Sequence, residues 1–435
     1  MDLYDGLIWN AIGGSGGGGG GGGDSGTAVL GKDVNLYDYD GTLLHSYSKS
    51  EFLALSSMPE NPNWNERLVA KGWNWSLADA KDYVRDYGIL DIGQMYDTAS
   101  GKTEIDTSFY PYAKHPYLKF YVNGTATIEW GDGTSDNITG SSLSASPQSI
   151  DHEYAAAGDY TIKIDGEVKP YATSNQIVWF SDGVTKGYGN QSRNVLYYGN
   201  VKRIYISKDF HVASDMLNGF ISLEEITISP DSLDTVLSRF ISSETKSLVK
   251  CMVLPTNITS IGSDAVTGSE IAVCCFHPNI TLLTTTSVSF PKNAKRLCLP
   301  PLLTAVYSSD FSYNYARTIV FPNDIASGIV PSSMPYLKEV IYPSAMETCS
   351  LYNSGSYALN KIVIPSGCLT VSSKVNKAYV LKEIHIQATT PPTLSEADAF
   401  TNLAEDAKIY VPSASLAAYQ AAANWSTFAD KMIGE

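Results

Sequence analysis

A short apolar phrase recurs along the second half of the chain, and its spacing limits what this sequence can fold into. It reads VKRIYIS from Val201, LEEITIS from Leu223 and LNKIVIP from Leu359, and several copies end in proline. One β-rich phrase every roughly 20–29 residues is typical of a solenoid, in which each repeat adds one coil. Ten copies, 21 to 26 residues apart, close at Ile206, Ile228, Leu254, His277, Leu299, Phe321, Tyr342, Ile364, Ile386 and Val411.

Composition narrows the class of protein around these repeats. The chain has 435 residues, more than one compact core usually holds, so several units are expected. Only 17% of the residues are charged and 28 are tyrosine, which favours a β-rich extracellular or virion protein. A net charge of −15 argues against binding nucleic acid. The sequence contains no run of about 18 apolar residues, so no membrane-spanning segment is expected. Its start lacks the basic region of a secretory signal peptide.

All cysteines fall inside the repeats, and none forms a C-x-x-C zinc pair. We expect them to be small buried residues on the repeat strands, with disulfides or a thiol site as the alternatives. They are Cys251, Cys274, Cys275, Cys298, Cys349 and Cys368.

Residues 1–31 predict an attachment peptide on a leash. A glycine run from Gly16 to Gly23 is typical of a flexible linker, and order imposed by partner chains is the alternative. The apolar residues before it are too few to fold alone but suffice to dock onto another protein. They are Leu3, Tyr4, Leu7, Ile8, Trp9 and Ile12.

Residues 32–106 predict a small α+β module. Asp40–Gly41 indicates a hairpin, a short helix is expected near 48–55, and Ser76 and Gly88 bound a second helix. A further hairpin is expected around Ser100–Gly101. The string YDYDGTLLHSYSKSEFLAL…GWNWSLADAKDYV resembles a module of tail and minor structural proteins of bacteriophages and prophages of gut bacteria. This resemblance implies a virion component and no chemical role.

The same stretch also resembles the first motif of haloacid dehalogenase-type phosphatases. Asp38 and Asp40 would be nucleophile and general acid, and GDGTSD from Gly131 to Asp136 would hold magnesium. Those enzymes need an alternating α/β sheet, which the single strong helix between the two motifs does not supply. The hairpin turn is the preferred interpretation.

Residues 107–167 form the next predicted unit. IEWGDGT followed by HEYAAAGDYTIKIDG resembles the polycystic-kidney-disease (PKD)-type β-sandwich. The resemblance places Trp130, Gly131, Asp132 and Gly133 in a tight turn, where glycine permits positive φ and Asp132 binds turn amides. Calcium binding by Asp132 and Asp136 is the alternative.

Residues 168–200 are rich in aromatic residues, glycine and asparagine. We expect them to cap the first repeat, and an exposed sugar-stacking surface is the alternative. The aromatic residues are Trp179, Phe180, Tyr188, Tyr197 and Tyr198.

The repeats of residues 201–412 resemble the BspA-type leucine-rich repeats of bacterial surface proteins, most clearly in VLPTNITSIGSDAVTGSEI from Val253. One short strand per repeat with an irregular back is expected. Residues 413–435 predict a capping helix. Its apolar face comprises Leu416, Tyr419, Ala423 and Phe428.

The sequence thus predicts a mainly β protein with no catalytic, metal or cofactor motif. The interpretation is a phage tail fibre or receptor-binding protein in the virion tail. Its N-terminus would contact other tail proteins, and its repeats, through their sheet face or the aromatic loops, a host surface protein or glycan. Fibres of this kind are commonly homotrimeric. The alternatives are a bacterial cell-surface adhesin and a virion-associated polysaccharide hydrolase, whose two acids leave no local motif.

Overall fold

A computed structural model provides the structure. The attachment peptide, the glycine run and residues 182–199 of the aromatic segment 168–200 lie outside the residues that it describes. These are 33–62, 65–109, 116–173, 176–177, 180–181, 200–217, 220–241, 247–262, 265–268, 270–282, 290–303, 314–321, 334–350, 358–372, 380–400 and 403–435.

The chain is mainly β, and a β-solenoid of about 8 turns runs from about residue 203 to residue 434. Each of the ten predicted phrases contains a strand, and successive strands that pair are parallel, one coil apart. The strands are β13 (Val201–Ile206), β14 (Glu225–Ile228), β16 (Cys251–Val253), β18 (Val273–Cys275), β20 (Arg296–Cys298), β21 (Thr318–Val320), β22 (Glu339–Ile341), β24 (Lys361–Ile364), β26 (Glu383–Ile386) and β28 (Lys408–Val411).

Alternation along each strand builds the core of the solenoid. Ile362, Ile384 and Ile409 face the inside of successive coils and are fully or almost fully buried. Each such side chain contributes about 1.5–3 kcal/mol by leaving water. The coils therefore hold together by stacking apolar residues at one repeat position.

The backs of the coils differ from the expectation of a single strand per repeat, which was wrong. Short strands also pair in parallel on the other side of the solenoid, where neighbouring coils present extended backbone at matching positions. They are β15 (Val236–Leu237), β17 (Ser260–Ile261), β19 (Thr281–Leu282), β23 (Thr348–Ser350), β25 (Thr370–Ser372) and β27 (Thr393–Leu394).

Residues 33–98 form a four-stranded sheet, ordered β2-β1-β4-β3, with two helices. The hairpin at Asp40–Gly41 is present, and Ser48 and Ser76 cap the two helices by accepting hydrogen bonds from backbone amides. Gly88 ends the second helix at φ +83°. The elements are β1 (Val34–Tyr37), β2 (Leu43–Tyr47), α1 (Lys49–Leu53), β3 (Leu68–Trp73), α2 (Leu77–Tyr87) and β4 (Leu90–Thr98). We call residues 33–98 the N-terminal module.

The predicted hairpin around Ser100–Gly101 was wrong. The chain turns there, but β5 (Thr103–Phe109) does not pair with β4; it lies between β9 and β13 of another sheet. β5 therefore crosses the boundary expected after residue 106. β5 pairs with β9 and β13 instead, and these strands satisfy the backbone hydrogen bonds along both of its edges.

Residues 103–181 form a sheet that runs directly into the solenoid. Its path is β12-β6-β9-β5-β13-β14, with β7 and β8 also paired to β6, so the first coil is an extension of this sheet. We call residues 103–181 the β-unit. Its other strands are β6 (Tyr117–Glu129), β7 (Ser135–Ser142), β8 (Gln148–Asp151), β9 (Gly158–Pro170) and β12 (Phe180–Ser181). β10 (Ala172–Thr173) and β11 (Gln176–Ile177) form a separate two-stranded sheet.

The C-terminal segment closes the solenoid, but not as the single helix that was expected. The chain breaks between α4 and η4, where Asn424 adopts φ +65°, and β29 then pairs with β28. Tyr419 and Trp425 donate hydrogen bonds to the carbonyls of Ala388 and Pro392. Satisfying both buried donors requires the break. The elements are η3 (Ser413–Ser415), α4 (Leu416–Ala421), η4 (Trp425–Lys431) and β29 (Met432–Gly434).

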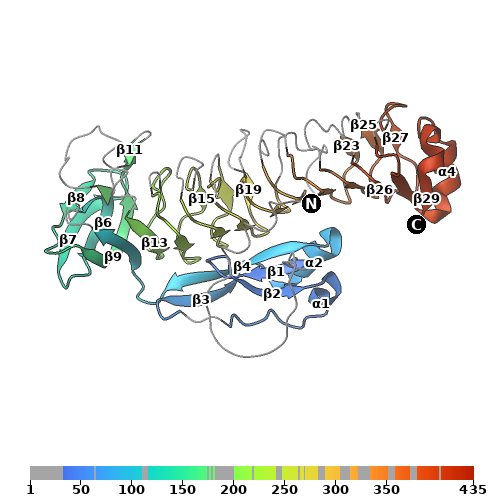
Figure 1. Ribbon diagram of the computed structural model, residues 1–435. Helices are drawn as coiled ribbons and strands as arrows, with labels where there is room; N and C mark the ends of the chain where they lie inside the picture. The colour runs from blue at the N-terminus through green and yellow to red at the C-terminus, as the bar shows by residue number, and fades with distance from the viewer. Residues whose placement is uncertain are drawn as a thin grey trace.

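The N-terminal module packs along the outward face of the main solenoid sheet, as Figure 1 shows. Gly93 on β4 fits against Val253 and Cys275, where an added Cβ would lie 2.5 Å and 3.0 Å from their side chains. Cys298 and Val320 join the core of the module. The middle of the sheet face is therefore covered by a mainly apolar contact, which also contains the buried ion pair between Arg296 and Asp91 at 3.5 Å.

Polar side chains of the module also reach the solenoid backbone. The Asn74 amide donates to the carbonyls of Leu254, Cys275 and Phe276 at 3.0–3.3 Å. The Trp75 indole donates to the Phe276 carbonyl at 2.7 Å, and the Tyr83 hydroxyl to that of Leu299 at 2.9 Å. These bonds fix the position of the module along the sheet.

All six cysteines are free and buried, as predicted. Three of them, Cys251, Cys275 and Cys298, lie on the outward face under the N-terminal module. Cys274, Cys349 and Cys368 belong to the core inside the coils.

Candidate recognition groove

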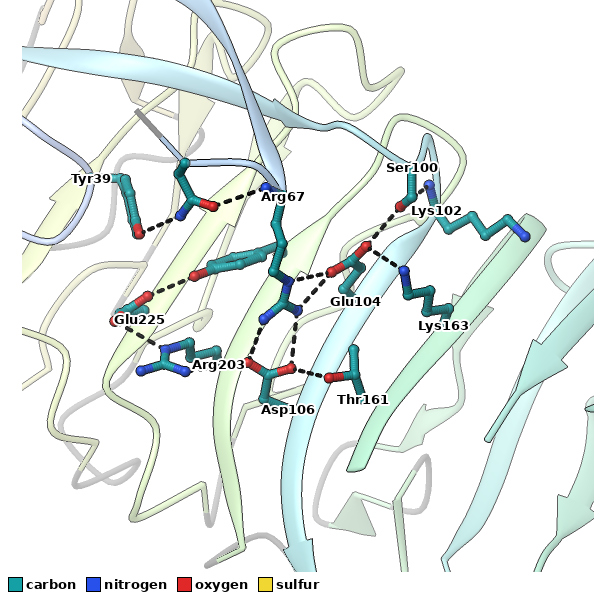
Figure 2. Close-up of polar contacts among 12 residues, drawn as sticks. Tyr39, Arg67, Ser100, Lys102, Glu104, Asp106, Thr161, Lys163, Arg203 and Glu225 are labelled. Carbon is teal, nitrogen blue, oxygen red and sulfur yellow. Dashed lines mark hydrogen bonds and ion pairs between the residues drawn. The ribbon is translucent and has the colours of Figure 1, made fainter. Parts of the chain in front are cut away.

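A polar cluster fixes the N-terminal module, the β-unit and the first coils to one another (Figure 2). Arg67 donates to Glu104 at 2.7 Å and to both oxygens of Asp106 at 2.8 and 3.0 Å. Arg203 bridges Asp106 at 3.5 Å and Glu225 at 3.1 Å. We call these five residues the polar joint. Burial opposes ionisation of Asp106, but the hydrogen bonds from Arg67 outweigh it and lower the pKa of that carboxyl.

The turn at Trp130–Gly133 joins β6 to β7. Gly131 and Gly133 adopt φ +83° and +90°, and a Cβ at Gly131 would lie 2.7 Å from the Thr161 carbonyl oxygen. Asp132 accepts hydrogen bonds from the amide and the hydroxyl of Thr134 at 3.0 and 2.6 Å. Only glycine fits the close approach at position 131.

Aromatic residues complete this turn. His152 stacks on the buried Trp130 at 4.7 Å, and its Nε2 lies 2.8 Å from Asp132. Burial alone would raise the pKa of Asp132, but the bonds from Thr134 and then His152 lower it to about 2. Trp130 donates to Asp136 at 2.8 Å. Protein donors thus bind both carboxylates that the sequence offered as calcium ligands.

The two acids of the phosphatase-like string also have local partners. Asp38 is buried and accepts from the Tyr96 hydroxyl at 2.7 Å, and Asp40 accepts from the Thr42 amide at 2.8 Å. They lie in the module sheet, whereas Asp132 and Asp136 lie in the β-unit. These contacts are those of a hairpin turn.

A groove of about 600 Å³ lies where the β-unit meets the backs of the first coils. Tyr121, Lys169 and the β7–β8 loop line one side, and residues 212–215 and 233–240 line the other. β15 lies in this second wall, on the side of the solenoid away from the N-terminal module (Figure 1). The N-terminal module covers the main sheet but not the groove, which lies on the other side of the solenoid.

Two residues in the groove wall adopt a conformation that side chains rarely take. Asp215 has φ +63° and Arg239 has φ +43°. The Asp215 amide donates to the Arg239 carbonyl at 2.9 Å, and the Arg239 guanidinium pairs with the Asp215 carboxylate. Left-handed backbone costs about 1–2 kcal/mol per residue, and such strain clusters at ligand sites. These bonds join two successive coils within this wall of the groove.

A histidine between two carboxylates supports the same wall. His211 Nδ1 lies 3.0 Å from Asp234, and Nε2 lies 3.3 Å from Glu167 on β9. Hydrogen bonding to Asp234 raises the pKa of His211, although partial burial opposes this. The contact ties the β-unit to two successive coils and holds the groove at a fixed width.

The groove also presents side chains to a ligand. Leu233 is 77% exposed and Val236 is 42% exposed, an apolar edge that no described residue covers. Lys169 contributes a cation and Tyr121 an aromatic ring on the opposite wall. Because Asp215 and Asp234 are bound to Arg239 and His211, the groove suits recognition by shape and mixed polarity better than acid–base chemistry.

Sequence reasoning missed this groove. It assigned recognition to the sheet face, whose middle the N-terminal module covers, or to the aromatic loops, which lie mostly outside the described residues. The residues of the two walls lie about 40 to 120 positions apart in the sequence, and positive φ at Asp215 and Arg239 has no sequence signal.

No protein-family model matches this chain, and no curated protein is significantly similar to it. In the part of the chain that the structure describes, no helix is long and apolar enough to cross a membrane. The same residues contain no group of three or more His, Cys, Asp or Glu side chains placed to hold a metal ion.

Proposed function

We propose that this chain is a receptor-binding structural protein of a phage tail fibre, attached to the virion through its N-terminus. Its repeat region recognises a component of the host-cell surface. The observation that carries this proposal is the open groove, which has an exposed apolar edge. The acidic side chains of its wall are paired with neighbouring side chains, as Asp215 is with Arg239. Such a groove suits a ligand held by contact and not converted.

The remaining resemblances support the same proposal. Residues 107–167 are proposed to be a PKD-like spacer, supported by the Trp130–Gly133 turn and its stacked histidine. Residues 32–106 are proposed to be a phage-tail-type module, and residues 1–12 the attachment peptide. Packing of the module along the solenoid, and continuation of the β-unit sheet into its first coil, would give the stiffness that a fibre tip needs.

Electron microscopy tests the location. Antibody raised against the purified chain should label the tails of phage particles from the source culture, and mass spectrometry of the purified particles should detect the chain. Labelling of the bacterial envelope in a phage-free culture would instead identify a cell-surface adhesin. Release of reducing ends from host capsule would identify a hydrolase.

Substitution of the groove tests recognition. Leu233→Ser with Lys169→Glu removes the more exposed residue of the apolar edge and the cation, and leaves the side chains of the Asp215–Arg239 and His211–Asp234 pairs in place. Binding of the labelled protein to host cells should fall roughly tenfold, because about 1.4 kcal/mol of contact is lost. The control is Leu369→Ser with Lys408→Glu, two exposed residues of the same types outside the groove. Equal binding by both variants would show that the groove is not the contact site.

A further inference from the structure

The outermost strand of the β-unit has a long edge with which no described strand pairs. From the solenoid outward the sheet runs β13-β5-β9-β6-β7, so β7 (Ser135–Ser142) is its last strand. β8 pairs with the same side of β6 but at residues 117–120, beyond the end of β7. Figure 1 shows β7 at the end of the molecule opposite α4. The outer edge of β7 therefore faces away from the rest of the molecule.

The register of the β6–β7 ladder shows which backbone groups this edge presents. The Trp130 amide donates to the Thr134 carbonyl at 3.0 Å, so these two residues form a hydrogen-bonded pair. Such pairs alternate along an antiparallel ladder, so the β7 residues of even number bond to β6. The N–H and C=O groups of the odd residues point outward, and no group in the described residues bonds to them. These residues are Ser135, Asn137, Thr139 and Ser141.

The edge lacks the features that usually prevent two sheet edges from pairing. Lysine, proline, a bulge or a covering element normally blocks an exposed edge strand. β7 reads SDNITGSS, without lysine or proline, and its register with β6 is unbroken. Its one charged residue, Asp136, accepts a hydrogen bond from the Trp130 indole at 2.8 Å. The four outward residues are exposed, and their side chains are short and uncharged, so another strand can approach.

The backbone of this edge is complementary to itself. When two copies meet about a two-fold axis at Ile138, an antiparallel ladder pairs Ser135 with Ser141 of the second copy. Asn137 pairs with Thr139 in the same way, and the axis repeats both pairs. Every outward N–H and C=O group of the edge then gains a partner, about eight hydrogen bonds in all.

The side chains suit the same register. Ile138 lies on the inner face of the sheet, where the axis brings the two Ile138 side chains together. Asp136 on that face lies opposite Gly140 of the second copy. On the outer face serine, threonine and asparagine meet, and such polar pairs can hydrogen-bond. No charged side chain of the two strands lies opposite a like charge, so a second copy of this chain fits the edge.

We propose that two copies of this chain associate through β7, so that one sheet runs from the solenoid of one copy to that of the other. An edge pairs with itself only about a two-fold axis, so this contact makes a dimer and not the trimer expected for a fibre. The contact is small and made mainly by backbone groups, so the dimer is reversible. Each copy has a net charge of −15, and salt that screens this repulsion should favour the dimer. The inference concerns assembly and is independent of the tail-fibre proposal.

Analytical ultracentrifugation of the full-length chain measures the association, and hydrogen exchange locates it. Sedimentation from about 1 to 200 µM should show a monomer–dimer equilibrium that shifts towards dimer as salt rises from about 20 to 500 mM. Peptides that cover residues 135–142 should gain amide protection as the protein concentration rises, whereas the β7–β8 loop should not. A chain that stays monomeric at about 200 µM, a trimer, or a dimer in which β7 gains no protection would overturn the inference.

Charge substitutions test the register. Asn137→Lys with Thr139→Lys places lysine opposite lysine across the axis and should weaken the dimer about tenfold, although the added cations reduce the net repulsion. Asn137→Glu with Thr139→Glu should weaken it similarly.

An equimolar mixture of the lysine and glutamate variants should restore the dimer, because lysine then faces glutamate; variants that had failed to fold would not recover in this way. The control, Ser366→Lys with Thr390→Lys, adds the same charge at two exposed residues of distant coils and should change the affinity by less than about threefold. Equal weakening by the control, or a mixture that stays monomeric, would refute self-pairing of β7.

Discussion

Asn74 is expected to hold the N-terminal module on the solenoid, and its removal should release the module. Its side-chain oxygen accepts from the Gly93 amide at 2.9 Å, inside the module. Its amide group donates to three solenoid carbonyls, of which that of Cys275 also accepts from the Leu254 amide at 3.0 Å. Asn74→Ala therefore leaves the Gly93 donor buried without its partner.

The size of the effect follows from which groups keep a bond. The Phe276 carbonyl retains the Trp75 indole at 2.7 Å, and the Cys275 carbonyl retains its backbone donor. One buried donor without a partner costs about 1–3 kcal/mol, and the Leu254 carbonyl adds about 1 kcal/mol. The variant should lose about 2–4 kcal/mol of docking free energy.

Thiol labelling measures this loss where it occurs. Undocking exposes Cys251, Cys275 and Cys298, whereas Cys274 and Cys349 stay inside the coils. If labelling proceeds through undocking, its rate at the first three should rise about 30- to 800-fold, since each 1.4 kcal/mol is a factor of ten. Mass spectrometry of the labelled peptides reads each site separately.

The control is Asn123→Ala, which removes an exposed side-chain bond to Glu167 and should change labelling by less than about threefold. An unchanged rate at the three outward cysteines in Asn74→Ala would refute the reasoning. A uniform rise at all six would indicate global unfolding and would equally contradict selective undocking.

Two further predictions concern the braces of the groove and of the polar joint. Because hydrogen bonding to Asp234 raises the pKa of His211, its stabilisation is complete below the unfolded-state pKa of about 6.5 and is lost as pH rises through the folded-state pKa. Urea unfolding should therefore show a gap between wild type and His211→Gln that is widest below about pH 6 and narrows towards pH 9; a gap independent of pH would contradict this. Arg67→Met should lower the free energy of unfolding by about 2–3 kcal/mol. The reason is that Glu104 is only 2% exposed and would retain a single cationic partner, Lys163. The control Arg85→Met, at an exposed ion pair, should lower it by less than about 0.5 kcal/mol.

The sequence determined by itself the elements that depend on neighbours within one coil or one turn. The ten apolar phrases predicted the strands, because alternation places one side of each strand in the coil core. Local chemistry likewise predicted the Asp40–Gly41 hairpin and the helix between Ser76 and Gly88. A second signal was available: the first outward position of each strand is apolar at Cys251 and Val273 but charged at 339, 361 and 383. A strand that is apolar on both faces predicts a cover, though not its identity.

The tertiary structure alone decided what that cover is and where the groove opens. Asn74 meets carbonyls about 200 residues away, and Glu167 meets His211 across a junction between units. Such contacts depend on how whole elements pack, so no local pattern encodes them. The same competition broke the expected C-terminal helix, since Tyr419 and Trp425 had to reach carbonyls of an earlier coil. A periodic sequence specifies the coil, and the fit between non-repeating surfaces specifies what the coil carries.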